Sequence, residues 1–135
     1  MPLTGLCRTP GCRLNGSVIN AHASGTPLND QTEKEGLRRI FGSRPPTAEG
    51  GAVVFGTKGN FGHSLGATGA IEAIALILAL QSGIVPPVYG LEQPETDFPL
   101  RLVVQEPLAH DSRVGCSVTL GFGGFDTCLV FERGT

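Results

Sequence analysis

The spacing of apolar residues divides this chain into short strands and two helices. Residues 17–20 are predicted to be the end of a short buried strand. The apolar run 52–55 carries no polar alternation, which is typical of a strand buried on both faces. Further strands are expected at 100–104, 114–120 and 126–131. The last two flank the turn Gly-Phe-Gly-Gly, so this end of the chain is predicted to form an antiparallel hairpin.

Two segments have the composition of helices. The first is expected to begin at the N-cap Asp30, with Glu33 as its capping-box partner, and to run to about Phe41. The second, at 65–82, is apolar nearly all round and ends at Gly83, so it must be enclosed between layers. The order of elements predicts an α/β fold, with a mixed sheet around a buried central helix.

Composition narrows the class of protein. The chain has 135 residues, of which 40% are hydrophobic, which is enough for the core of one domain. Its net charge of −2 and the lack of a basic run argue against nucleic-acid binding. The apolar stretch 70–80 is shorter than a membrane span and contains Glu72, and residues 1–18 contain no apolar signal core. We therefore expect a cytoplasmic protein that does not enter the membrane.

The four cysteines do not predict a metal centre. None forms a C-x-x-C pair, and the spacing of Cys7 and Cys12 allows only a weak metal clip with no second ligand pair. Cys116 and Cys128 lie inside predicted strands, where reduced and buried thiols are expected.

Two histidines lie in loops of small residues. His22 follows the first strand, where ligands gather in α/β sheets, and His63 lies in a Gly-rich loop just before the apolar helix. Small neighbours leave an imidazole uncovered, which suits contact with a ligand. The loop around His63 lacks the P-loop and dinucleotide patterns, so a nucleotide site is not indicated.

Other polar residues near these loops allow two interpretations each. Lys58 and Glu72 are the only charged residues between 53 and 80, so a buried ion pair is expected. That pair is either purely structural or orients His63 and sets its proton affinity. Ser24 and Thr26 either bond local backbone groups or offer hydroxyls to a polar ligand.

Three strings resemble motifs of the β-ketoacyl synthases, in the order that the family has them. Residues 20–33 read Asn-Ala-His-x-x-Gly-Thr-Pro-Leu-Asn-Asp-x-x-Glu, and residues 58–72 read Lys-Gly-Asn-x-Gly-His-Ser-x-Gly-Ala-x-Gly-Ala-x-Glu. Residues 120–124 read Leu-Gly-Phe-Gly-Gly. The resemblance covers the C-terminal part of the family: it assigns 17–135 to that domain and leaves 1–16 as an irregular lead-in.

The resemblance implies a fold and a reaction. The fold is the C-terminal half of a thiolase-like structure, with the apolar helix at its centre. The reaction is the decarboxylative condensation of acyl and malonyl thioesters in fatty-acid or polyketide biosynthesis. The substrates ride on the phosphopantetheine of an acyl-carrier protein, and no further cofactor is expected.

Roles for individual residues follow from the same resemblance. His22 and His63 would stabilise the enolate oxygen of the malonyl thioester, and Lys58 would pair with Glu72 to hold the His63 loop. Ser24 and Thr26 would contact the phosphopantetheine arm. The backbone N–H of Phe122 would form half of the oxyanion hole, and its ring would gate the acyl pocket.

The chain also departs from the family. The nucleophilic cysteine and the N-terminal half are missing, and no cysteine here lies at a strand-to-helix elbow. Ala23-Ser24 replaces the usual Gly-Thr, and Phe125-Asp126 replaces Thr-Asn. We therefore expect a chain that is inactive alone, pairs with the missing half and forms homo- or hetero-oligomers. The alternatives are a non-catalytic partner subunit resembling a chain-length factor and a malonyl-thioester decarboxylase.

Overall fold

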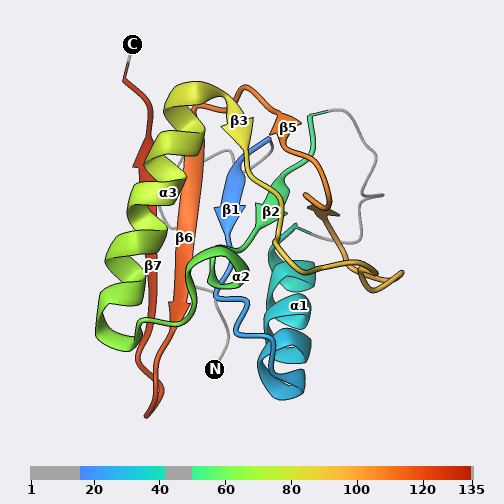
Figure 1. The fold of residues 1–135 in the computed structure, drawn as a ribbon, viewed down its shortest axis with the longest axis vertical. Helices are drawn as coiled ribbons and strands as arrows, with labels where there is room; N and C mark the ends of the chain where they lie inside the picture. The colour runs from blue at the N-terminus through green and yellow to red at the C-terminus, as the bar shows by residue number, and fades with distance from the viewer. Residues whose placement is uncertain (1–15, 42–49, 135) are drawn as a thin grey trace.

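The chain forms one mixed five-stranded sheet between helices. A computed structural model describes residues 16–41 and 50–134 (Figure 1). The helical elements are α1 (Pro27–Phe41), α2 (Lys58–Phe61), the 3₁₀ turn η1 (Leu65–Ala67) and α3 (Thr68–Ser82). The strands are β1 (Val18–Asn20), β2 (Val53–Phe55), β3 (Ile84–Val85), β4 (Arg101–Leu102), β5 (Leu108–Ala109), β6 (Val114–Leu120) and β7 (Asp126–Glu132).

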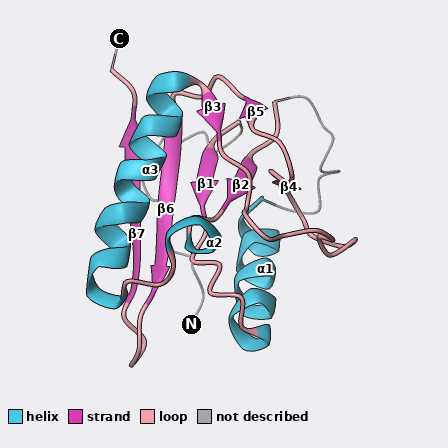
Figure 2. Ribbon diagram, viewed as in Figure 1, coloured by secondary structure: helices cyan, strands magenta, loops and turns pink. Residues whose placement is uncertain are grey.

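The sheet has the order β4-β2-β1-β6-β7. β1 runs parallel to both β2 and β6, and β4 runs parallel to β2. β7 runs antiparallel to β6, as the hairpin prediction required, and it forms one edge of the sheet (Figure 2). The mixed sheet is thus confirmed. β3 and β5 form a separate small ladder, which the sequence pattern missed.

The pleat of the central strands creates two cores on opposite faces. Val18 and Phe55 belong to one buried cluster together with Leu76 of α3. Ile19 belongs to the other cluster, together with Leu37 of α1. Because successive side chains of a strand point to opposite faces, α1 and α3 must cover different faces of the sheet. The molecule is therefore layered as helix, sheet and helix.

α3 is covered on one face only. Glu72, Leu76, Ala79 and Leu80 are buried against the sheet, whereas Ile74 and Leu78 remain 59% and 58% exposed. Enclosure on all sides was expected, and within the described residues only the sheet supplies it. Gly83 ends the helix in the left-handed conformation, as predicted.

Residues 65–82, η1 and α3 together, are long and apolar enough to span a bilayer by length and composition alone. The expectation that this stretch is too short counted only 70–80, so the length argument was wrong. Glu72, however, lies in the middle of the helix, fully buried and ion-paired. Its packing on the sheet is that of the core helix of an α/β domain.

Several boundaries differ from the prediction. α1 begins at Pro27, where a fixed φ suits the first turn, so Asp30 lies inside the helix rather than at its cap. The Gly-rich loop before α3 contains the short helix α2. Residues 1–15, with Cys7 and Cys12, lie outside the described residues. Cys116 is buried in β6 and Cys128 half-buried in β7.

Candidate active site

The first histidine loop is held by a buried carboxylate. His22 lies two residues beyond β1 and is buried. Its backbone N–H donates to Glu33 Oε1 over 2.7 Å, and the N–H of Ala23 donates to Oε2 over 2.9 Å. Ala23 has a φ of +41°, a strained value for a residue with a Cβ. Glu33 of α1 therefore braces a tight turn, instead of closing the capping box expected for it.

The second histidine lies in a loop shaped by glycine. Gly62 has a φ of +77° and delivers the chain from α2 to His63, which is exposed. The backbone N–H of Leu65 donates to His63 Nδ1 over 3.2 Å. Thr68 Oγ1 lies 3.1 Å from the same nitrogen. Because Nδ1 accepts the backbone N–H, the neutral ring carries its proton on Nε2.

Lys58 and Glu72 form the buried ion pair that the sequence predicted. Their side chains are 7% and 0% exposed, and Lys58 Nζ donates to Glu72 Oε1. The other carboxylate oxygen, Oε2, accepts from Thr119 Oγ1 over 3.1 Å. Glu72 thus has a donor on each oxygen, which a buried carboxylate requires.

The ammonium of Lys58 reaches the first histidine loop rather than the second. Nζ donates to the carbonyl oxygen of His22 and lies 3.3 Å from His22 Nδ1. The pair of Lys58 and Glu72 also joins the two ends of the segment that contains His63, so the role of holding the His63 loop stays a prediction. An ammonium facing Nδ1 favours the tautomer of His22 with its proton on Nε2.

The two imidazoles face each other. Their ring centroids are 5.8 Å apart, and the rings meet edge to face at 84°. The pKa of His22 is lowered from 6.5 to about 4, first by burial and then by the charges of Lys58 and His63. Asp126 and Asp30 act in the opposite direction. His22 is therefore neutral at physiological pH, and in the described part of the chain neither Nε2 has a protein partner.

This arrangement suits one ligand chemistry. With ring centroids 5.8 Å apart, the two imidazoles are close enough for an N–H of each to donate to one oxygen placed between them, since each hydrogen bond spans roughly 2.9 Å. Neutral donors stabilise negative charge that develops on such an oxygen without giving up a proton. The geometry therefore fits an oxyanion site.

The hydroxyls predicted to bind a ligand contact each other. Ser24 Oγ lies 3.1 Å from Thr26 Oγ1 at the mouth of the first loop. Ser24 also lines a cavity of about 500 Å³ that includes Lys58 and His63, whereas Thr26 does not line it. The two hydroxyls thus form a local hydrogen bond with each other, and contact with a ligand stays a prediction.

Phe122 lies in the turn between β6 and β7 and is 92% exposed. The N–H of Gly121 bonds Phe125 O over 2.9 Å, and that of Gly124 bonds Gly121 O over 3.3 Å. The turn therefore orders the chain around Phe122 without using its N–H, among the bonds of the described residues. The ring of Phe125 is also exposed.

Three contributors to the site were missed or misread from the sequence. Glu33 was expected to cap α1 and instead holds the His22 loop. Thr119 completes the shell of Glu72 from β6, and Asn20 Nδ2 donates to the carbonyl of Glu72 over 3.0 Å. The short spacing of Glu33 from the His22 loop could have indicated its contact with that loop. Nothing in the sequence near Thr119 indicates its contact with Glu72. Among the described residues, no cluster of three or more metal-ligating side chains occurs.

The fold defines the class as a thiolase-like α/β domain. A family model described as "Beta-ketoacyl synthase, C-terminal domain" matches residues 15–92. The chain belongs to this family, as the C-terminal ketosynthase domain of fatty-acid or polyketide synthases.

Relatives in sequence carry both pathways in their names. The chain is 36% identical over 117 residues to 3-oxoacyl-[acyl-carrier-protein] synthase 2 of Synechocystis, covering 87% of this chain and 27% of the relative. It is 37% identical over 121 residues to putative polyketide beta-ketoacyl synthase 1 of Streptomyces halstedii, covering 87% and 28%. It is 33% identical over 115 residues to nodulation protein E of Rhizobium meliloti, covering 85% and 28%.

Solved structures agree with the fold. The ishigamide ketosynthase/chain length factor matches with a TM-score of 0.82 at 28% identity, over 93% of this chain and 30% of that one. A type II polyketide ketosynthase, solved in complex with its acyl-carrier protein, matches with a TM-score of 0.78 at 25% identity, over 87% and 28%. The chain thus spans less than a third of the proteins that it matches.

Proposed function

We propose that this chain supplies the thioester-activating part of a β-ketoacyl synthase. The observation that carries the proposal is the pair of facing imidazoles, each with Nδ1 occupied and Nε2 available. Membership of the family supports the same chemistry. The substrate would be a malonyl thioester presented on the phosphopantetheine arm of an acyl-carrier protein, with no other cofactor.

In this proposal His22 and His63 donate from Nε2 to the carbonyl oxygen of the malonyl thioester. The bond from Cα to the carboxylate carbon breaks, CO₂ leaves, and the electron pair passes to Cα and the thioester oxygen. Neutral imidazoles are the appropriate donors, because an imidazolium would protonate the enolate. Removal of one such donor typically costs about 10²–10³ in rate.

The remaining steps need the part of the protein that carries the cysteine. The enolate carbon attacks the acyl group on that cysteine, a carbon–carbon bond forms, and the cysteine departs as thiolate. The backbone N–H of Phe122 would stabilise the oxyanion of this second step, with its ring as the gate. Ser24 and Thr26 would bind the phosphopantetheine arm after exchanging their mutual bond for bonds to the ligand.

An N-terminal ketosynthase half is the partner that this proposal requires. The apolar face of α3, with Ile74 and Leu78 exposed, would pack against it. Alone, the chain should associate through this face. We expect sedimentation to show oligomers that shift towards monomer in the double variant Ile74→Gln/Leu78→Gln; a monodisperse monomer of the unmodified chain would contradict this.

Two rival functions remain. A subunit resembling a chain-length factor is favoured by Phe125 and Asp126, which place a ring and a carboxylate where the family has Thr-Asn. The histidine pair argues against it, because a pure scaffold needs no oxyanion donors. A decarboxylase that lacks the condensation step would need the same two histidines.

The test measures CO₂ release and acyl transfer separately. The chain is combined with a cysteine-bearing ketosynthase half, malonyl-loaded acyl-carrier protein is supplied, and labelled CO₂ is collected. His22→Ala and His63→Ala should each lower release about 100-fold. His110→Ala, which removes the histidine bonded to the Gly16 carbonyl, is the control and should change release less than twofold.

The outcomes separate the alternatives. Condensation that requires both chains supports the proposal, and acyl transfer onto this chain alone would refute inactivity in isolation. CO₂ release by the chain alone, lost in His63→Ala, would identify a decarboxylase. If the chain binds the other half but neither histidine variant changes the rate of CO₂ release, the chain is a scaffold.

A further inference from the structure

A polar segment forms the outer wall of the cavity beside His63. We call residues 89–98, which connect the small ladder to β4, the strap. Seven of the strap's residues line the cavity: Tyr89, Gly90, Leu91, Gln93, Pro94, Glu95 and Phe98. Residues 92–97 are all exposed, so apolar burial cannot hold this part of the chain in place.

The start of the strap is fixed by backbone contacts. The N–H of Val88 donates to Val103 O over 2.9 Å. A Cβ built on Gly59 would come within 2.2 Å of Tyr89 O, so α2 and the strap touch at a position where only glycine fits. Beyond Leu91, by contrast, the described bonds within the strap reduce to Phe98 N–H donating to Glu95 O over 3.2 Å.

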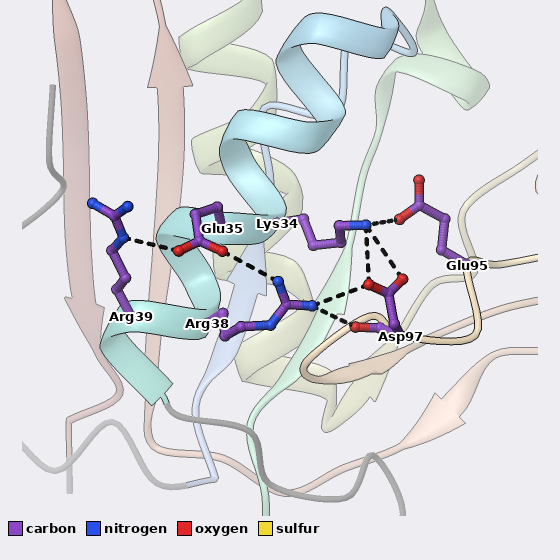
Figure 3. A network of polar contacts seen from close by, with 6 residues as sticks. All are labelled: Lys34, Glu35, Arg38, Arg39, Glu95 and Asp97. Atoms are coloured by element: carbon purple, nitrogen blue, oxygen red, sulfur yellow. Dashed lines mark hydrogen bonds and ion pairs between the residues drawn. The ribbon is translucent and has the colours of Figure 1, made fainter.

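Charged side chains tie the far part of the strap to α1 (Figure 3). Lys34 donates to Glu95 and lies 3.2 Å from Asp97 Oδ1. Arg38 donates from Nη2 to the carbonyl oxygen of Asp97 over 2.8 Å and to its Oδ2 over 3.3 Å. These contacts join residues 59 to 63 positions apart in the chain.

The charges on the two elements are complementary. The strap carries Glu92, Glu95 and Asp97 and no basic residue, while α1 presents Lys34 and Arg38 towards it. Lys34 is only 16% exposed, so its ammonium is partly withdrawn from water and binds its partners more firmly than a free surface lysine. A network that shares one cation and one carboxylate also holds better than isolated pairs.

We propose that the strap is a lid over the cavity beside His63, latched to α1 by Lys34 and Arg38, and that it opens when this latch is screened or removed. The backbone contacts at Val88 and Tyr89 then hold one end of the strap, Phe98 holds the other by packing on the core, and the exposed residues 92–97 move. Opening exposes the apolar floor of the cavity, which includes Val54 and Leu102. The inference concerns access and does not depend on the reaction proposed above.

Hydrogen exchange of the full 135-residue chain tests the latch. Lys34→Gln/Arg38→Gln should raise the exchange rate of the Phe98 amide about fivefold or more, while amides of β6 keep their rates. Salt at 0.5 M should raise the rate in the unmodified chain and add little in the variant. Arg39→Gln is the matched control, because the partner of Arg39 among the described residues is Glu35, 3.0 Å away on the same helix.

Access to the cavity is measured with a neutral, soluble paramagnetic probe. In the latch variant, methyl signals of Val54 and Leu102 should broaden, while those of Leu76, on the opposite face of the sheet, should not. Unchanged Phe98 exchange would overturn the latch. Faster exchange without broadening at Val54 would overturn the lid, and parallel acceleration in β6 would mean that the variant merely destabilises the fold.

If the double variant Lys34→Gln/Arg38→Gln does not fold, the single variant Lys34→Arg tests whether the charge of Lys34 holds the strap closed. It keeps the charge, and it should keep both the slow exchange of Phe98 and the sharp Val54 signals. Lys34→Met at low salt should then behave as the unmodified chain does at 0.5 M salt; equal behaviour of Arg and Met variants would overturn the proposal.

Discussion

Replacing Lys58 by methionine tests the arrangement on which the site depends. The substitution keeps most of the side-chain volume but removes the ammonium that pairs with Glu72 and with the carbonyl oxygen of His22. Glu72 is fully buried and, among the described residues, its carboxylate would retain the hydrogen bond from Thr119 alone. Breaking a buried pair in this way costs about 3–5 kcal/mol, and the remaining donor places this case near 3 kcal/mol.

Urea unfolding measures this cost, with the slope of the transition as the check on two-state behaviour. The double variant Lys58→Met/Glu72→Gln removes the stranded charge as well, so it should recover most of the loss. NMR titration supplies a second readout, because the pKa of His22 should rise once the nearby cation is gone. A loss below about 1 kcal/mol in the single variant, or no recovery in the double, would refute the reasoning.

Two further predictions concern the loops. His22 should titrate near pH 4 by NMR, whereas a histidine in the unfolded chain titrates near 6.5. The stability that neutral His22 contributes is therefore complete above pH 6.5, and up to about 3 kcal/mol of it is lost as the pH falls towards 4. The variant His22→Gln should not show this loss. The raised pKa of Glu33 opposes this trend, because its folded state binds a proton more readily, so the titration is read residue by residue. Gly59→Ala should cost about 1–3 kcal/mol in urea unfolding, since its Cβ meets the Tyr89 carbonyl, whereas Gly66→Ala, with open space around it, should cost far less.

Local pattern was sufficient for much of the secondary structure. β6 has the bounds that its apolar run predicted, and Gly83 ends α3 where expected. The start of α1 was misplaced, because Asp30 satisfies the rules for a cap but Pro27 begins the helix earlier. β3 and β5 have two residues each, and a strand that short carries no period to detect.

Local sequence also indicated part of the candidate site. The small-residue loops predicted that His22 and His63 face a ligand, and the isolation of Lys58 and Glu72 among apolar residues correctly predicted that they pair. The resemblance to the β-ketoacyl synthase motifs then predicted a specific chemistry for these residues. Each of these signals lies within a short stretch of chain, where spacing and residue size are sufficient evidence.

The tertiary structure alone decided which atoms meet. Lys58 reaches His22 across 36 positions, Thr119 reaches Glu72 across 47, and the strap meets α1 across about 60. The sequence by itself determined the elements and the reactive groups, because these follow from local spacing and residue chemistry. Tautomer, proton affinity and access follow from contacts between distant residues, which exist only once the sheet has brought its strands side by side.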